Sequence, residues 1–107
     1  MADRIDYNPT ESAPVLVVGS VAFDNVITPH GSKDGILGGA ASYCSFATSY
    51  FTQPRMVGVI GNDFGEEHLE RLRKRGIDLE GIQKDPSGPT FFWKGQYHEN
   101  FNRRDTL

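Results

Sequence analysis

The sequence PVLVVGSVAFDNVI, residues 14–27, decides the fold class. Its uninterrupted apolar run from Val15 to Val18 is typical of a strand covered on both faces in a parallel sheet. A Gly-Ser pair ends the run, and Asp24 follows. Because ligands of open α/β sheets bind beyond the carboxyl ends of the strands, Asp24 is a candidate acceptor for the hydroxyls of a polyol. The alternative is an Asx-turn or a solvated loop acid.

A glycine pair, Gly38 and Gly39, opens the sequence GGAASYCSFATSYF. A glycine-rich entry to a helix can direct backbone N–H groups at a phosphate or another ligand oxygen. The alternative is a turn that requires positive φ. The pair fits neither the Walker loop nor the dinucleotide fingerprint. Helical spacing predicts that one face of the helix carries Tyr43, Phe46, Ala47, Tyr50 and Phe51.

Residues 28–35, TPHGSKDG, are rich in turn formers and predict a surface loop before this helix. After the helix, the apolar residues 55–61 predict a second strand. In residues 62–76, NDFGEEHLERLRKRG, Asp63 is the predicted N-cap, and Glu66 completes a capping box.

Basic residues gather in the last turn of this second helix, where they suit the helix dipole, so RLRKR is not interpreted as a nucleic-acid patch. Glu67 with Arg71 and Glu70 with Lys74 are the predicted i,i+4 pairs. Gly76 is the predicted residue after the helix.

The end of the chain, TFFWKGQYHENFNRRDT, predicts a hairpin within residues 88–107, with strands near 90–97 and 101–106. Its five aromatic residues must pack on the core, a ligand or a partner chain. Alternating strands and helices over the whole chain predict a parallel α/β sheet with right-handed crossovers.

With 107 residues the chain fits one small domain, which we place at residues 14–107 after a flexible polar leader, residues 1–13. Its net charge of −3 argues against nucleic acid as a partner. No stretch has membrane-spanning length. Cys44 is the only cysteine, which excludes an internal disulfide and a cysteine zinc site and fits a reducing cytoplasm. Its position inside the apolar helix predicts a packing role rather than a nucleophile. Scattered histidines predict no metal site.

Four stretches in order resemble the ribokinase-like (PfkB-type) carbohydrate kinases: VLVVGSVAFD, LGGAASYCSFA, VGVIGNDFGEEHLERLRKRGID and GPTFFWKGQYHEN. The resemblance covers the chain from Val15 onward. It implies a partial ribokinase-like fold, namely the N-terminal, substrate-side part, with a mostly parallel sheet, flanking helices and a β-hairpin lid.

The resemblance implies an ATP- and Mg²⁺-dependent kinase that phosphorylates a hydroxymethyl group of a sugar, nucleoside or polyol. Asp24 would bind substrate hydroxyls, and Gly38 and Gly39 would contact the substrate through their backbone. Phe92 and Trp93 would lie on or near the lid. Tyr43 stands where family members often carry asparagine; it is either a pocket residue or core packing.

The family's catalytic G-A-G-D stretch does not occur in these 107 residues. We therefore expect no catalytic residue in this chain, and no activity from the chain alone. The alternative hypothesis is a non-catalytic binding module that forms a homodimer through the aromatic lid strands.

Overall fold

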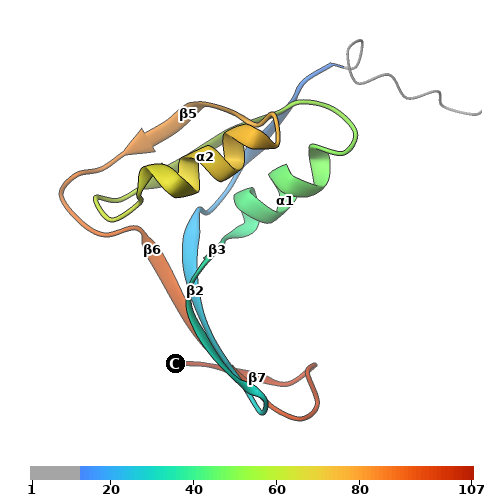
Figure 1. The fold of residues 1–107 in the computed structure, drawn as a ribbon, viewed down its shortest axis with the longest axis vertical. Helices are drawn as coiled ribbons and strands as arrows, with labels where there is room; N and C mark the ends of the chain where they lie inside the picture. Colours follow the sequence, from blue (N-terminus) through green and yellow to red (C-terminus); the bar gives the residue numbers. More distant parts are fainter. Residues whose placement is uncertain (1–12) are drawn as a thin grey trace, which may run out of the picture.

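The computed structural model describes residues 13–107, so the predicted leader lies almost entirely outside the described residues. Two sheets share one chain: β1, β4 and β5 form one, and β3, β2, β6 and β7 form the other in that order. Two helices lie beside the first sheet (Figure 1). The elements in chain order are β1 (Val15–Val18), β2 (Ala22–Thr28), β3 (Gly31–Gly38), α1 (Ala40–Thr48), β4 (Pro54–Ile60), α2 (Glu66–Lys74), β5 (Asp78–Lys84), β6 (Phe91–Tyr97) and β7 (Arg104–Thr106).

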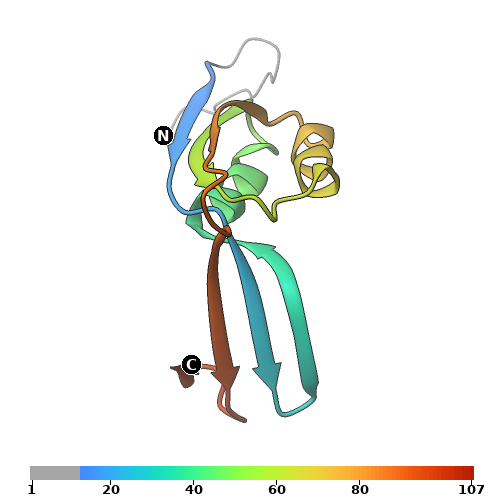
Figure 2. The ribbon, with the colours of Figure 1, turned by 90° about the vertical axis from the view of Figure 1, so that its left-hand side faces the viewer.

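The three-stranded sheet is entirely parallel, which confirms the predicted α/β class. In its register Val17 pairs with Met56. Both side chains are buried, and they meet Leu72 of α2 and Ala41 of α1 in one core. Both helices therefore lie on the same face of this sheet (Figure 2).

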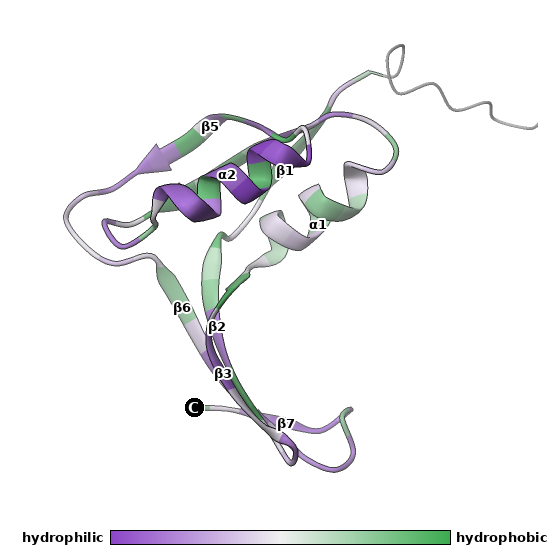
Figure 3. Ribbon diagram, in the orientation of Figure 1, coloured by the Kyte–Doolittle hydropathy of each residue, from purple (hydrophilic) through white to green (hydrophobic). Residues whose placement is uncertain are grey.

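Neither helix of the described part of the chain covers the opposite face of the same sheet. Leu16 is 65% exposed and Val18 is 70% exposed. The prediction that residues 15–18 are covered on both faces is therefore wrong for residues 13–107, because neither helix lies on that side. Figure 3 shows β1 as a hydrophobic strand.

Helix α1 buries mainly a different face from the predicted one, of which Phe46 packs against the core while Tyr43, Tyr50 and Phe51 are exposed. Its buried residues are Ala41, Ser42 and Ser45. Tyr43 and Cys44 are exposed, so the packing role predicted for Cys44 is wrong. The physical reason is a close approach between α1 and the first sheet, which only small side chains permit.

Helix α2 begins later than its predicted cap. Its N-cap is Gly65, without a side-chain capping bond, so the capping box of Asp63 and Glu66 does not form. The predicted i,i+4 ion pairs are also replaced: Arg73 pairs with both Glu66 and Glu70. The expected helix end is present, since Gly76 has a φ of +75°.

The four-stranded sheet contains a strand, β3, where the turn-rich sequence predicts a loop. Residues 31–38 form β3, which pairs antiparallel with β2. The polar residues of β3 take strand geometry because β2 supplies the hydrogen bonds. The Asn25 side chain accepts a hydrogen bond from the backbone N–H of Gly35 at 2.8 Å, beside a register shift in β2. The expected antiparallel strands near the C-terminus are present as β6 and β7.

Hydrogen bonds around Thr90 connect the end of β4 to the start of β6, and thus one sheet to the other. Asp63 follows β4 and accepts a hydrogen bond from the backbone N–H of Thr90 at 2.7 Å. The buried Thr90 hydroxyl accepts one from the Gly61 N–H at 3.0 Å. Hydrogen bonds from Thr90 hold the pKa of Asp63 below its ordinary value. Asp63 therefore fixes the start of β6 rather than capping α2.

Candidate functional site

Ser20, between β1 and β2, fixes the start of α1. Its carbonyl accepts a hydrogen bond from Ala41 N–H at 2.9 Å, and its hydroxyl accepts one from Ala40 N–H at 3.0 Å. These two N–H groups at the helix N-terminus are therefore already paired within the protein. The phosphate-cradle interpretation of this helix start loses two of the donors that it needs.

The two glycines of the pair have different structural roles. Gly39 has a φ of +92°, and a Cβ atom there would lie 2.4 Å from the Ser20 carbonyl oxygen. This geometry matches the positive-φ turn that the sequence analysis left as the alternative. Gly38 is different, because a Cβ atom there would lie 2.3 Å from Oδ2 of Asp24. Gly38 thus leaves the space that the Asp24 carboxylate occupies.

Asp24 lies within β2, three residues into the second sheet rather than at the end of β1. Its Oδ2 accepts a hydrogen bond from the Tyr43 hydroxyl at 3.3 Å. Partial burial, followed by the charge of Asp24 and this hydrogen bond, raises the pKa of the Tyr43 phenol. Tyr43 therefore stays a neutral donor to Asp24 at ordinary pH, with 56% of its surface exposed.

Asp24 and Tyr43 line an open hollow of about 280 Å³ between the start of α1 and the four-stranded sheet. The hollow is lined by Ala22, Asp24, Gly39, Ala40, Tyr43, Phe91, Trp93, Tyr97 and Arg104. It brings together four of the predicted site residues: Asp24, Gly39, Tyr43 and Trp93. Gly38 supports it from behind Asp24.

The parallel register of β2 and β6 selects which aromatic residues face the hollow. Ala22 pairs with Phe91 and Asp24 with Trp93, whereas Phe23 pairs with Phe92. Since successive side chains of a strand point to opposite faces, Phe92 does not line the hollow. Phe23 instead stacks on Phe64 at 5.3 Å between ring centroids, within the core.

Five residues of the hollow were not predicted as site residues: the small Ala22 and Ala40, and the larger Phe91, Tyr97 and Arg104. The alternation of β6 was a usable signal for Phe91 and Tyr97, because these two residues and Trp93 fall on one face. Arg104 comes to the hollow from β7, which pairs Arg104 with Tyr97.

A larger hollow of about 520 Å³ lies on the uncovered face of the three-stranded sheet. It is lined by Val18, Gly19, Ser20, Val21, Val57, Gly58, Val59, Gly81, Gln83 and Phe91. None of these side chains is charged or titratable. The hollow at Asp24 therefore has the stronger chemical case for recognising a polar ligand.

No group of three or more His, Cys, Asp and Glu residues within positions 13–107 is placed to hold a metal ion. Neither α1 nor α2 has the length and apolar character needed to cross a bilayer.

Two curated relatives of the chain are named as kinases. A cytidine kinase of Thermococcus kodakarensis is 36% identical over 89 residues, which make up 80% of this chain and 31% of that protein. A 2-dehydro-3-deoxygluconokinase of Thermoproteus tenax is 33% identical over 64 residues, 59% of this chain and 20% of that protein. The chain thus spans less than a third of the length of these relatives. No family model matches it.

Solved structures share the fold over most of the chain. A nucleoside kinase of Burkholderia thailandensis in complex with inosine matches with a TM-score of 0.77 and 22% identity, covering 89% of this chain and 35% of that one. A ribokinase of Cryptococcus neoformans in complex with ADP matches with a TM-score of 0.68 and 20% identity, covering 90% and 34%. At such identities the likeness establishes the fold.

Proposed function

We propose a substrate-binding function for this chain, because it has the ribokinase-like fold and resembles the sugar and nucleoside kinases of that family. The chain forms the part of an ATP-dependent kinase that holds a sugar, nucleoside or related polyol for phosphorylation of a hydroxymethyl group. The observation that carries the proposal is the Asp24 carboxylate in a hollow with aromatic walls.

Each part of the hollow suits a polyol. An ionised carboxylate is an acceptor only, so Asp24 accepts hydrogen bonds from ligand hydroxyls. Tyr43 already donates to one of its oxygens and orients it. Trp93 and Tyr97 offer flat apolar faces against which the C–H face of a sugar, or a base, can pack. Gly39 lines the hollow with backbone atoms alone.

The residues present do not fit ATP with Mg²⁺. Phosphoryl transfer requires groups that position the γ-phosphate and neutralise its charge. The hollow at Asp24 has one basic side chain, Arg104, and the sequence has no Walker loop and no G-A-G-D stretch. We therefore propose that the chain alone binds the acceptor substrate without transferring phosphate. Turnover in an ATP-coupled assay of the purified chain with sugars and nucleosides would contradict this.

Ligand binding tests the role of Asp24 directly. Trp93 is the single tryptophan and lines the hollow, so its fluorescence reports on occupancy. A panel of sugars, polyols and nucleosides is titrated, with calorimetry as a second readout. Asp24→Asn should weaken binding about tenfold or more, as expected for loss of hydrogen bonds to a charged group.

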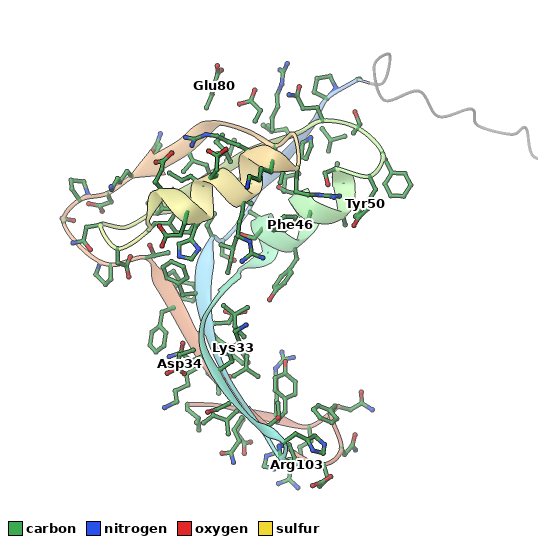
Figure 4. The ribbon with its side chains drawn as sticks, in the orientation of Figure 1. Lys33, Asp34, Phe46, Tyr50, Glu80 and Arg103 are labelled. Carbon is green, nitrogen blue, oxygen red and sulfur yellow. The ribbon has the colours of Figure 1, made fainter. Side chains whose placement is uncertain are left out.

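The matched control for this variant is Asp34→Asn. Asp34 is an exposed carboxylate on β3 that does not line the hollow, and Figure 4 labels its position. Equal binding by the wild-type chain and both variants would reject the role of Asp24. The absence of binding by every compound would reject the proposed function.

A second candidate function is a dimerisation module built on the lid strands. β3 and β7 are the edges of the four-stranded sheet, and exposed edges can add a strand from another chain. Phe92 and Phe101 are each more than half exposed nearby. Size-exclusion chromatography with light scattering tests this candidate: a dimer that survives dilution would support it, and a monomer at every concentration would reject it.

A further inference from the structure

The hollow at Asp24 also holds a cation, Arg104, that has no anionic partner among residues 13–107. Arg104 lines it, and its guanidinium carbon lies 5.8 Å from the centroid of the Trp93 ring. Within residues 13–107 Arg104 takes part in no ion pair. The neighbouring carboxylate of Asp105 is already engaged, at 2.9 Å from Nε2 of His98.

Hydrogen bonds between β6 and β7 hold the Trp93 ring in place beside Arg104. The indole N–H of Trp93 donates to the Thr106 hydroxyl at 3.2 Å. The backbone N–H of Leu107 donates to the Lys94 carbonyl at 2.8 Å, which closes β7 onto β6. An arginine that stacks on a held aromatic ring keeps its guanidinium oriented and loses less freedom on binding a ligand.

The two charged side chains of the hollow come from backbone positions that are well separated. Arg104 and Asp24 line one hollow, and within residues 13–107 no ion pair joins them. Along β6, the partner of Arg104 is Tyr97 and the partner of Asp24 is Trp93, four residues apart. The backbones therefore stand about 13 Å apart along the strand direction, and the arginine side chain reaches back toward Trp93.

We propose that the ligand of this hollow is a polyhydroxy carboxylate, that is, a sugar acid. Its carboxylate pairs with the planar fork of Arg104, whose donors match both carboxylate oxygens. Its hydroxyls donate to Asp24, whose negative charge excludes the opposite orientation. The volume of about 280 Å³ suits a compact ligand of this kind. The inference rests on the proposed function and names its substrate class.

D-gluconate and D-glucitol are the probes, because they share a carbon chain and differ in the carboxylate. Titrations follow Trp93 fluorescence and calorimetric heat. D-gluconate should bind the wild-type chain about tenfold more tightly than D-glucitol, the difference expected for a charge-assisted hydrogen-bonded pair. Its affinity should also fall as salt is raised, since the charges are partly exposed.

Arg104→Gln should remove the preference for D-gluconate, and Arg104→Lys should retain only part of it, because lysine keeps the charge without the fork. Arg103→Gln is the matched control. Arg103 is the preceding arginine of the same hairpin and does not line the hollow, and Figure 4 shows it at the far tip of the sheet. Circular dichroism checks that each variant is folded.

Each failure has a distinct meaning. Equal affinity for the two probes, or a preference that survives in folded Arg104→Gln, would overturn the sugar-acid proposal. If neutral polyols or nucleosides bound with dependence on Asp24 in the same experiment, the proposed function would stand without it. If no compound of either kind bound, both proposals would fail.

Discussion

Replacing Gly38 by alanine should displace the Asp24 carboxylate and weaken ligand binding, while the fold stays almost as stable as in the wild-type chain. A methyl group at position 38 would lie 2.3 Å from Oδ2 and 2.7 Å from Cγ of Asp24. Ordinary van der Waals contact begins at 3.4 Å, so the carboxylate must move by more than 1 Å. The backbone itself accepts alanine, since Gly38 is not among the glycines with positive φ.

The magnitudes of the two effects differ. Moving Asp24 breaks its hydrogen bond with Tyr43, which costs about 1 kcal/mol. Alanine in place of glycine also lowers the conformational entropy of the unfolded chain, which offsets about 0.4–1 kcal/mol of this cost. The free energy of unfolding should therefore change by less than about 1 kcal/mol. Ligand binding loses a hydrogen bond to a charged group, about 1.5–3 kcal/mol, which is a loss of roughly tenfold to a hundredfold in affinity.

The assay pairs urea unfolding with titration of D-glucitol, both followed through Trp93. Gly88→Ala is the matched control, because a Cβ atom there would have no heavy atom within 4 Å. The control should match the wild-type chain in both measurements. Unchanged affinity in Gly38→Ala would refute the argument, and so would a loss of stability above about 2 kcal/mol, the range of strained or clashing backbone.

Three further predictions concern the fold. Gly39→Ala should destabilise the chain by at least about 2 kcal/mol in urea unfolding, because position 39 combines positive φ with a Cβ contact of 2.4 Å to Ser20. Leu72→Ala should cost about 2–5 kcal/mol by the same measurement, since Leu72 is 1% exposed in the core; a smaller loss would mean that the site collapses. The pKa of Asp63 is lowered on folding. The contribution of ionised Asp63 to the free energy of unfolding is therefore complete above the unfolded pKa of about 3.9, and it disappears as pH falls through the lower folded pKa. Urea midpoints of the wild-type chain and Asp63→Asn should thus differ at pH 6 and converge in acid; a constant difference would contradict the linkage.

The sequence predicted those features whose physical cause is local. The apolar runs gave β1 and β4, because continuous hydrophobic residues favour a buried parallel strand. Gly76 marked the end of α2, since few other residues adopt positive φ there. The ordered motifs indicated the ribokinase-like fold, which the structural matches confirm.

Local signals failed where contacts between distant segments decide the outcome. β3 reads as a loop because its first residues are polar and include glycine, and it becomes a strand through pairing with β2. Asp63 has the chemistry of a cap, yet its carboxylate binds Thr90, 27 residues away. Tyr43 fits a buried helical face by spacing, but the small side chains of α1 pack closer to the sheet.

In the candidate site, too, some residues could be predicted from the sequence, whereas others are brought in only by contacts between distant segments. Residue chemistry in the sequence suggested Asp24 and the glycine pair as candidates, and the family resemblance added Tyr43, Phe92 and Trp93. Only the tertiary structure assigned Gly38 to the space beside Asp24 and brought Arg104 to the same hollow. The physical reason is register: the pairing of β2 with β6, and of β6 with β7, fixes which side chains of segments about 80 residues apart share one face of a sheet.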